Sequence, residues 1–320
     1  MKRFALSSFL LFFAFAAVVT APHTFVAQQN PASVPSSANA ASTPDLSPGA
    51  NGKLSQEQMQ QLFRVVADKD MQNDKLLRNY TYIEREVNSR VNGKGEIKST
   101  EERTYDILDI YGEPVQRLTQ KDGKPLPEKE AAKEDEKIQK IIDKRKNETE
   151  DERRKREEKE QKEREQDREF ARDVADAYNF TLVGTQTLNG REAWVIDGEP
   201  RPGFVPHAKD AKYLSKFHGR VWIDKSDLQL AKLDVECLDT ISWGLFLARF
   251  HKGSRFMLEQ TRVNDEVWLP QHLTAKVDAR LALFKSLDEN IEQTYSDYKK
   301  FRVTAKIVGI GDVKNQSPSQ

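Results

Sequence analysis

The chain has 320 residues, and its 51 Lys and Arg are balanced by 51 Asp and Glu, which gives a formal net charge of zero. Because no global positive field results, we expect no nucleic-acid partner. The one cysteine, Cys237, excludes an internal disulfide framework. We expect it to be a small core residue rather than a nucleophile.

Residues 1–27 have the pattern of an export signal. Lys2 and Arg3 precede the apolar run FALSSFLLFFAFAAVV, and small residues follow. A single membrane anchor is the alternative, since such a run could barely cross about 30 Å of hydrocarbon. We predict a cleaved signal peptide and a periplasmic protein whose contact with the membrane is at most transient. Residues 28–53 are rich in Pro, Ser, Ala and Asn, which is typical of a disordered linker, and we expect 311–320 to be a flexible tail.

An amphipathic helix is predicted from residue 55 to about 77. Ser55 and Gln58 have the spacing of a capping box. Apolar residues then recur at helical spacing, which predicts one buried face formed by Met59, Leu62, Phe63 and Val66.

Strands follow on both sides of a charged segment. From Tyr80 the apolar period changes to two, and Asn92-Gly93-Lys94-Gly95 separates two strand-like runs. From Asn179 to about Ile310 the chain is again strand-rich, and Asn189-Gly190 is its strongest hairpin signal. Short turns between consecutive strands indicate an antiparallel sheet with one face turned inward, and hence an α+β fold.

Residues 128–173 contain 34 charged positions out of 46. Acids precede bases by four residues in five pairs such as Glu160–Arg164, and each pair contributes about 0.2–0.5 kcal/mol to a helix. We therefore predict a protruding, solvated helical insertion without a core of its own. RNA binding through its basic residues is a weaker alternative, since the interleaved acids would repel phosphates.

Catalytic motifs are missing from the sequence. It contains no phosphate loop, dinucleotide fingerprint, nucleophile elbow or zinc-binding helix motif. Asp197 and Asp224 both end apolar strand runs, which suggests a hydrolase pair assisted by a histidine. We favour the interpretation that both aspartates are turn residues. The scattered histidines His207, His218, His251 and His272 are interpreted as surface residues. The basic residues around the Pro-rich loop are interpreted as solvated surface, with an anionic headgroup site as the alternative.

The strands between 219 and 283 carry more large apolar side chains than the one predicted amphipathic helix would be expected to cover. Two interpretations stay open: a filled core under that helix, or a partly filled concave sheet that leaves room for an apolar ligand. For the second, the candidate ligand-lining residues are Trp194, Ile196, Trp222, Leu233, Val235, Trp243, Leu245, Phe246, Leu247, Phe256, Leu258, Trp268 and Leu281.

Three short motifs carry a resemblance to a known family. GTQTLNGREAWVID, GRVWIDKSDLQLAKLDVE and VNDEVWLPQHL, in this order, resemble periplasmic outer-membrane lipoprotein-sorting proteins, the relatives of LolA and RseB. The resemblance covers roughly residues 55–125 and 175–310. It implies a single domain over 54–310, in which a strongly curved antiparallel half-barrel with covering helices holds acyl chains or a partner protein on its concave face. The insertion at 128–173 is foreign to the carrier proteins, and no lid residue of theirs can be assigned here.

The sequence thus predicts a non-enzymatic periplasmic protein, without cofactor or metal, that holds a lipid or a lipoprotein acyl chain as a carrier or envelope sensor. The rival prediction is an envelope interaction module whose charged helix 128–173 binds a partner protein.

Overall fold

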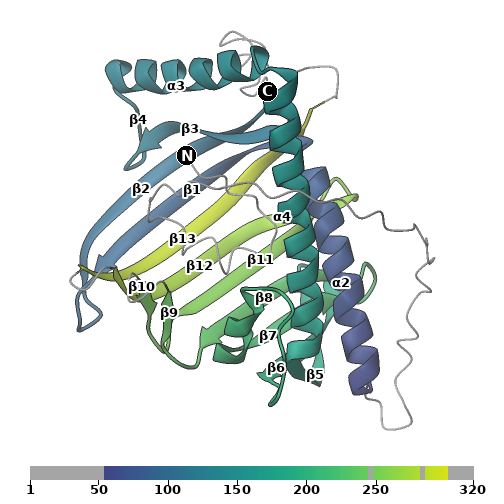
Figure 1. Cartoon of the computed structure of the whole chain (residues 1–320). Helices are drawn as coiled ribbons and strands as arrows, with labels where there is room; N and C mark the ends of the chain where they lie inside the picture. Colours follow the sequence, from purple (N-terminus) through teal and green to yellow (C-terminus); the bar gives the residue numbers. More distant parts are fainter. Residues whose placement is uncertain (1–53, 244–247, 282–284, 302–320) are drawn as a thin grey trace.

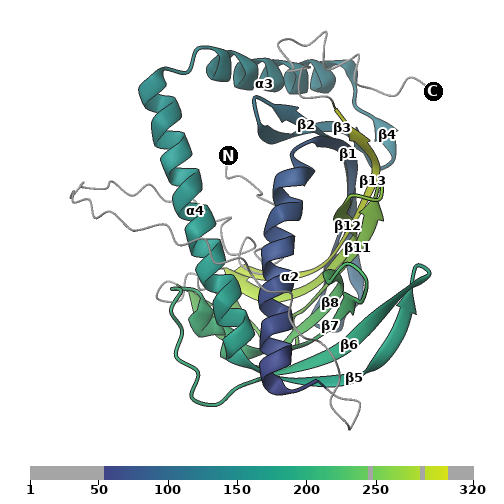
Figure 2. The ribbon, with the colours of Figure 1, turned by 90° about the vertical axis from the view of Figure 1, so that its right-hand side faces the viewer.

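The computed structural model describes residues 54–243, 248–281 and 285–301. Within these residues thirteen strands form one antiparallel sheet, in the order β4-β3-β2-β1-β13-β12-β11-β8-β7-β6-β5, with β9 and β10 attached beside β12. The sheet is strongly curved and open, ending at β4 and β5 (Figures 1 and 2). The predicted α+β class with a curved antiparallel sheet is therefore confirmed. The strands are β1 (Tyr80–Val91), β2 (Ile97–Ile110), β3 (Glu113–Lys121), β4 (Lys124–Pro125), β5 (Tyr178–Leu188), β6 (Arg191–Pro200), β7 (Phe217–Asp224), β8 (Gln229–Cys237), β9 (Ile241–Trp243), β10 (Ala248–Phe250), β11 (Arg255–Val263), β12 (Val267–Leu281) and β13 (Lys285–Lys300).

Local turn chemistry sets most of this topology. Asn189 and Gly190 both adopt positive φ, 50° and 77°, which is the backbone of a two-residue hairpin, and β5 pairs with β6 across them. Asp122 and Gly123, at φ 48° and 70°, turn β3 into β4 in the same way. One long-range pairing, β1 against β13, joins the first hairpins to the last strand and makes the sheet continuous.

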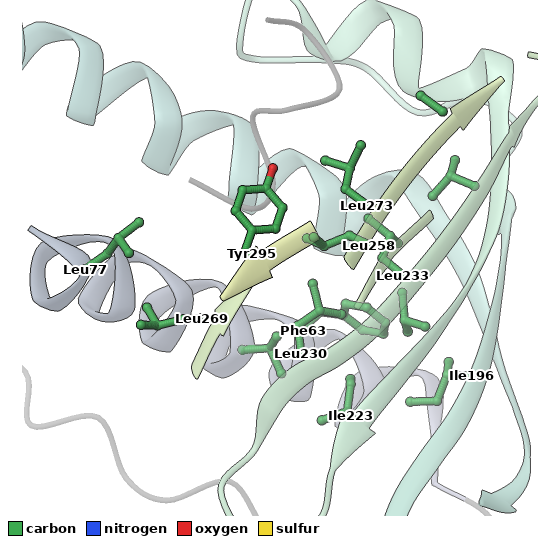
Figure 3. Close-up of a cluster of buried hydrophobic side chains, with 14 of the residues drawn as sticks. Phe63, Leu77, Ile196, Ile223, Leu230, Leu233, Leu258, Leu269, Leu273 and Tyr295 are labelled. Carbon is green, nitrogen blue, oxygen red and sulfur yellow. The ribbon is translucent and has the colours of Figure 1, made fainter. Parts of the chain in front are cut away.

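The helix α2 (Gln56–Leu77) lies in the hollow of the sheet (Figure 2). It begins as predicted: the Ser55 side chain accepts a hydrogen bond from the Gln58 backbone, and the Gln58 side chain accepts one from the Ser55 backbone. Its four predicted core residues, Met59, Leu62, Phe63 and Val66, are at most 3% exposed. Figure 3 shows Phe63 directed toward Leu230, Leu233 and Leu258 of the strands.

The charged segment forms two helices, which corrects the prediction of a single solvated one. The helix α3 (Glu128–Lys146) lies along β3, and α4 (Glu150–Ala177) begins after a new N-cap at Thr149. Ile138 and Ile142 of α3 are at most 1% exposed and pack on Leu108 and Ile110 of β2. The segment therefore has anchors in the core at both ends, because α4 also buries apolar residues near its C-terminus.

Between these anchors α4 is held by its own charges. Glu160 pairs with Arg164 at 3.7 Å, as predicted, and also with Arg156 at 3.3 Å. Glu148, before the helix, receives two hydrogen bonds of 2.9 Å from Arg156 and one from Arg145. These contacts stabilise the corner between α3 and α4, where all three side chains are less than one-fifth exposed.

Candidate functional site

An apolar cavity of about 80 Å³ lies between α2, α4 and the concave face of β5–β8. It is larger than the roughly 30 Å³ that one water occupies, yet far smaller than the roughly 300–1,000 Å³ of typical ligand sites. His218 also borders the cavity, but it alternates with Phe217 and Gly219, and its ring lies beside Glu199 and Glu236 on the other face of the sheet. The lining residues are Phe63, Phe170, Val174, Tyr178, Phe180, Gly198, Leu214, Phe217, His218, Gly219, Val221, Leu233 and Val235.

Stacked aromatic rings form one wall. The ring of Phe63 on α2 lies 3.9 Å from that of Phe180 on β5 at an interplanar angle of 14°. Tyr178 lies 6.0 Å further along from Phe180, and its hydroxyl donates a 2.9 Å hydrogen bond to the Leu214 carbonyl. The polar tip of Tyr178 is thereby satisfied, so the wall presents ring faces and edges to the cavity.

Two glycines face each other on the floor. Gly198 on β6 is the register partner of Gly219 on β7, and both line the cavity. A Cβ on Gly198 would lie 3.4 Å from the Phe180 ring, which is ordinary contact. A Cβ on Gly219 would lie 2.9 Å from the Asp234 carbonyl, which is too close. Gly198 therefore has room for a small side chain against the Phe180 ring, whereas at Gly219 the neighbouring strand β8 already occupies the place of a Cβ.

The segment 201–216, including the 3₁₀ helix η2 (Ala211–Lys216), covers one end of the cavity. Asp173 of α4, 1% exposed, fastens it by accepting hydrogen bonds from the backbone of His207 at 2.8 Å and of Ala208 at 2.7 Å. The same carboxylate lies 2.7 Å from Nδ1 of His207 and raises the pKa of this exposed imidazole. These contacts to Asp173 and Tyr178 hold the cover together with backbone hydrogen bonds at its two ends, from Arg201 to the Ala177 carbonyl and from Leu238 to the Lys216 carbonyl.

The predicted lining residues fall into three groups. Leu233 and Val235 line the cavity, while Trp194, Ile196, Phe256 and Leu258 belong to or pack against the adjoining core. Trp222 and Trp268 alternate with buried core residues of their own strands and therefore lie on the opposite, convex face of the sheet. Their predicted place in the concave lining was wrong. Leu245, Phe246 and Leu247 are outside the described residues, as are the side chains of Trp243 and Leu281. Whether any of these residues contacts a ligand stays a prediction.

The two misplaced tryptophans each donate an indole hydrogen bond to a polar side chain. Trp222 packs with Ala193 and Val195 and donates a 2.8 Å hydrogen bond to Gln186. Trp268 donates one of 2.9 Å to Asp227 and lies 5.5 Å below the Arg191 guanidinium. Trp268 and Arg191 border a second cavity of about 320 Å³, lined by a mixture of charged, polar and apolar groups.

Asp197 and Asp224 do not form a catalytic pair. Arg220 makes two hydrogen bonds to Asp197 at 2.5 and 2.8 Å, and Arg191 makes two to Asp224 at 2.7 and 2.8 Å. Burial alone would raise the pKa of Asp224, but the Arg191 contacts and backbone N–H groups of the turn lower it below the ordinary value. The predicted role of Asp224 as a turn residue is confirmed, because it accepts from the backbone of Ser226 and Asp227. Arginine occupies both carboxylates, which leaves neither as a base.

The remaining chemical candidates are also accounted for. His218, His251 and His272 each lie within 4.0 Å of a carboxylate oxygen on the sheet surface. Cys237 is a buried free thiol, as expected. Among the described residues there is no group of three or more potential metal ligands, and no helix there is both long and apolar enough to cross a membrane.

Sequence reasoning missed the residues that close the cavity. Phe170 and Val174, four residues apart on α4, signal an apolar contact at the end of the charged segment. Gly198 and Gly219 are strand glycines, which often mark a close approach of backbone or ligand. Both signals were readable in the sequence.

Comparisons with known proteins give only distant matches. No family model matches the chain, and no curated protein does. Similar solved structures include an outer membrane lipoprotein-sorting protein domain from Vibrio parahaemolyticus, with 11% identity, a TM-score of 0.33, and coverage of 82% of this chain and 98% of that one. A LolA-superfamily protein from Nitrosomonas europaea has 9% identity and a TM-score of 0.22 and covers 76% and 98%. The MucA/MucB complex of Pseudomonas aeruginosa has 10% identity and a TM-score of 0.20 and covers 78% and 96%.

These neighbours bear names of the family that the sequence motifs resemble. At such identities and TM-scores they carry no argument about ligand or partner, which has to come from the site itself.

Proposed function

We propose that this protein binds the hydrocarbon part of a lipid or of a lipid-modified protein in the cavity between α2, α4 and β5–β8. The observation that carries the proposal is the lining: aromatic rings, aliphatic side chains and two glycines meet there, and the lining residues include no Asp, Glu, Lys or Arg. A site without fixed polar groups selects for hydrocarbon rather than for a particular headgroup. It offers neither nucleophile nor base, so the role is holding rather than conversion.

The cavity is too small for a whole acyl chain. At about 80 Å³ it accommodates only part of an acyl chain, so a whole chain requires a neighbouring wall to move. The segment 201–216 is the candidate, because it contains no strand and its middle is held through hydrogen bonds to two side chains, Asp173 and Tyr178. Binding would then couple to opening of this cover.

Binding of a fluorescent palmitate analogue, measured by titration, tests the proposal. Gly198→Val fills the floor and should weaken binding about tenfold or more, equivalent to about 1.4 kcal/mol. Gly184→Val is the matched control, because a Cβ at this strand glycine meets nothing within 4 Å. Equal affinities of the two variants and the parent would put the probe elsewhere and reject the site.

The periplasm is the proposed location. Support comes from the export-signal pattern of residues 1–27, which lie outside the described residues, and from the absence of a second cysteine. Mass spectrometry of lipid extracted from protein purified from its own envelope would identify a natural ligand. A protein that is consistently free of lipid would count against the carrier role.

The rival role, partner binding through the charged helices, needs a different experiment from deletion of 128–173. Because Ile138, Ile142 and Phe170 are core residues, such a deletion would disturb the fold itself. Reversal of exposed charges on α4, for example Arg154→Glu with Asp151→Arg, retains the 2.7 Å ion pair between them while changing the surface. Loss of a co-purifying protein in that variant, with lipid binding intact, would favour the rival role.

A further inference from the structure

The two ends of the sheet are protected very differently. At one end β4 consists of Lys124 and Pro125 alone, and α3 lies beside it over β3. A short terminal strand, lysine, proline and a covering helix are the usual devices that prevent a sheet edge from pairing with another chain. The other end has β5, whose eleven residues YNFTLVGTQTL include neither a charged residue nor a proline.

At the start of β5, one side chain makes the backbone hydrogen bonds that a neighbouring strand would make. Gln56 of α2 donates from its amide to the Tyr178 carbonyl at 3.1 Å, and its oxygen accepts from the Phe180 backbone at 3.3 Å. These are the contacts that one residue of an added strand would make. Beyond Phe180, no described strand pairs with this edge.

The open stretch is Gly184–Leu188. A β-bulge between Leu182 and Gly184 interrupts the regular register on one side, and the Asn189-Gly190 turn ends the strand on the other. Leu188 and Arg191 close that turn as a hydrogen-bonded pair, so the alternation of antiparallel pairing directs the backbone of Thr187 and Thr185 to the open edge. Residues 183–187 are all exposed, and Figure 2 shows the β5–β6 hairpin extending away from the helices.

We propose that a second copy of this chain pairs with the open edge, so that two β5 strands meet antiparallel about a two-fold axis at Gln186. In this register Thr185 of each copy lies opposite Thr187 of the other, a pairing that β-sheets favour. Self-pairing suits an uncharged strand in a chain of 32% charged residues, because no like charges meet at the axis. Each copy uses the same patch, so the assembly closes as a dimer. The contact is short, which makes it concentration-dependent.

Sedimentation equilibrium of the full exported chain over a range of concentrations tests the proposal. The parent should shift from monomer to dimer as concentration rises. Thr185→Lys with Thr187→Lys puts two lysine pairs face to face and should weaken dimerisation by roughly a factor of 5–30. Thr185→Val with Thr187→Val, uncharged and of similar shape, should keep it.

A charge-reversal mixture makes the register itself testable. Thr185→Glu with Thr187→Glu should also be monomeric alone, and an equimolar mixture with the lysine variant should restore a heterodimer. Circular dichroism checks that each variant is folded. A parent that stays monomeric at the highest concentration, including one that binds a foreign peptide at this edge instead, would overturn the proposal. So would a dimer that the lysine variant leaves unchanged.

Discussion

Glu84 makes the stability of the fold depend on pH. Its side chain on β1 is 3% exposed, and its register partners are Tyr105 and Tyr295. Burial, with the negative charge of Glu86 adding to it, raises the pKa of Glu84 from 4.5 to about 7, although a 3.2 Å hydrogen bond from Gln116 acts in the opposite direction.

The sign of the effect follows from proton linkage. Below pH 4.5 Glu84 is protonated in both the folded and the unfolded chain, so it costs nothing. Between pH 4.5 and about 7 the unfolded chain releases the proton while the folded chain keeps it, and the free energy of unfolding falls. At 1.36 kcal/mol per unit, a shift of about 2.5 units removes roughly 3 kcal/mol, and the loss is complete above pH 7.

Glu84→Gln removes this dependence while its amide oxygen can still accept from Gln116. The variant should match the parent at pH 4 and exceed its free energy of unfolding by roughly 3 kcal/mol at pH 8. Urea denaturation of both proteins from pH 4 to pH 8 measures the difference, in which contributions from other buried acids cancel. Glu101→Gln, at an exposed position of β2, controls for the loss of one negative charge. A constant difference between Glu84→Gln and the parent at all pH values would refute the reasoning.

Two further predictions concern packing. Ile142→Ala should lower the free energy of unfolding by about 2–5 kcal/mol, since Ile142 is 0% exposed. Its neighbour Ile141 is only partly buried, so Ile141→Ala should lower the free energy of unfolding less. Equal effects of the two substitutions in thermal denaturation would mean that α3 is not anchored through Ile142. Gly219→Ala should lower the free energy of unfolding by about 1–3 kcal/mol, because its Cβ would meet the Asp234 carbonyl at 2.9 Å. Gly184→Ala is the control, because a Cβ there has open space around it. If Gly219→Ala has no effect in the same assay, β7 and β8 separate easily.

Features that depend on a few adjacent residues were predictable from the sequence. The capping box of Ser55 and Gln58 and the positive-φ turn at Asn189-Gly190 need only local chemistry, and both appear as expected. Along β12 a period of two likewise buries Ala275, Val277 and Ala279.

The face on which Trp222 and Trp268 lie was predicted wrongly for a reason that the sequence contains. Trp222 stands between Val221 and Ile223, and Trp268 between Val267 and Leu269, so a period of two puts each tryptophan on the opposite face from its neighbours. The prediction followed the size of the two tryptophan side chains rather than this alternation. The pairing of Arg191 with Asp224 and Trp268 could not be read in this way, since it joins three separate segments across the sheet.

The composition of the charged segment follows from what it spans. A helix of 28 residues such as α4 is about 42 Å long, which carries the chain from the corner with α3 to the cavity. Apolar side chains occur where the helices contact the sheet or the cavity cover, at Ile138 and Ile142 and again from Phe170 onward. Between these contacts the helix has no core to face, so a high density of alternating charges both keeps it soluble and stabilises it. The high charge follows from a long stretch of helix that faces no apolar core, and the apolar C-terminal end of the segment, from Phe170 onward, is the part that marks the candidate site.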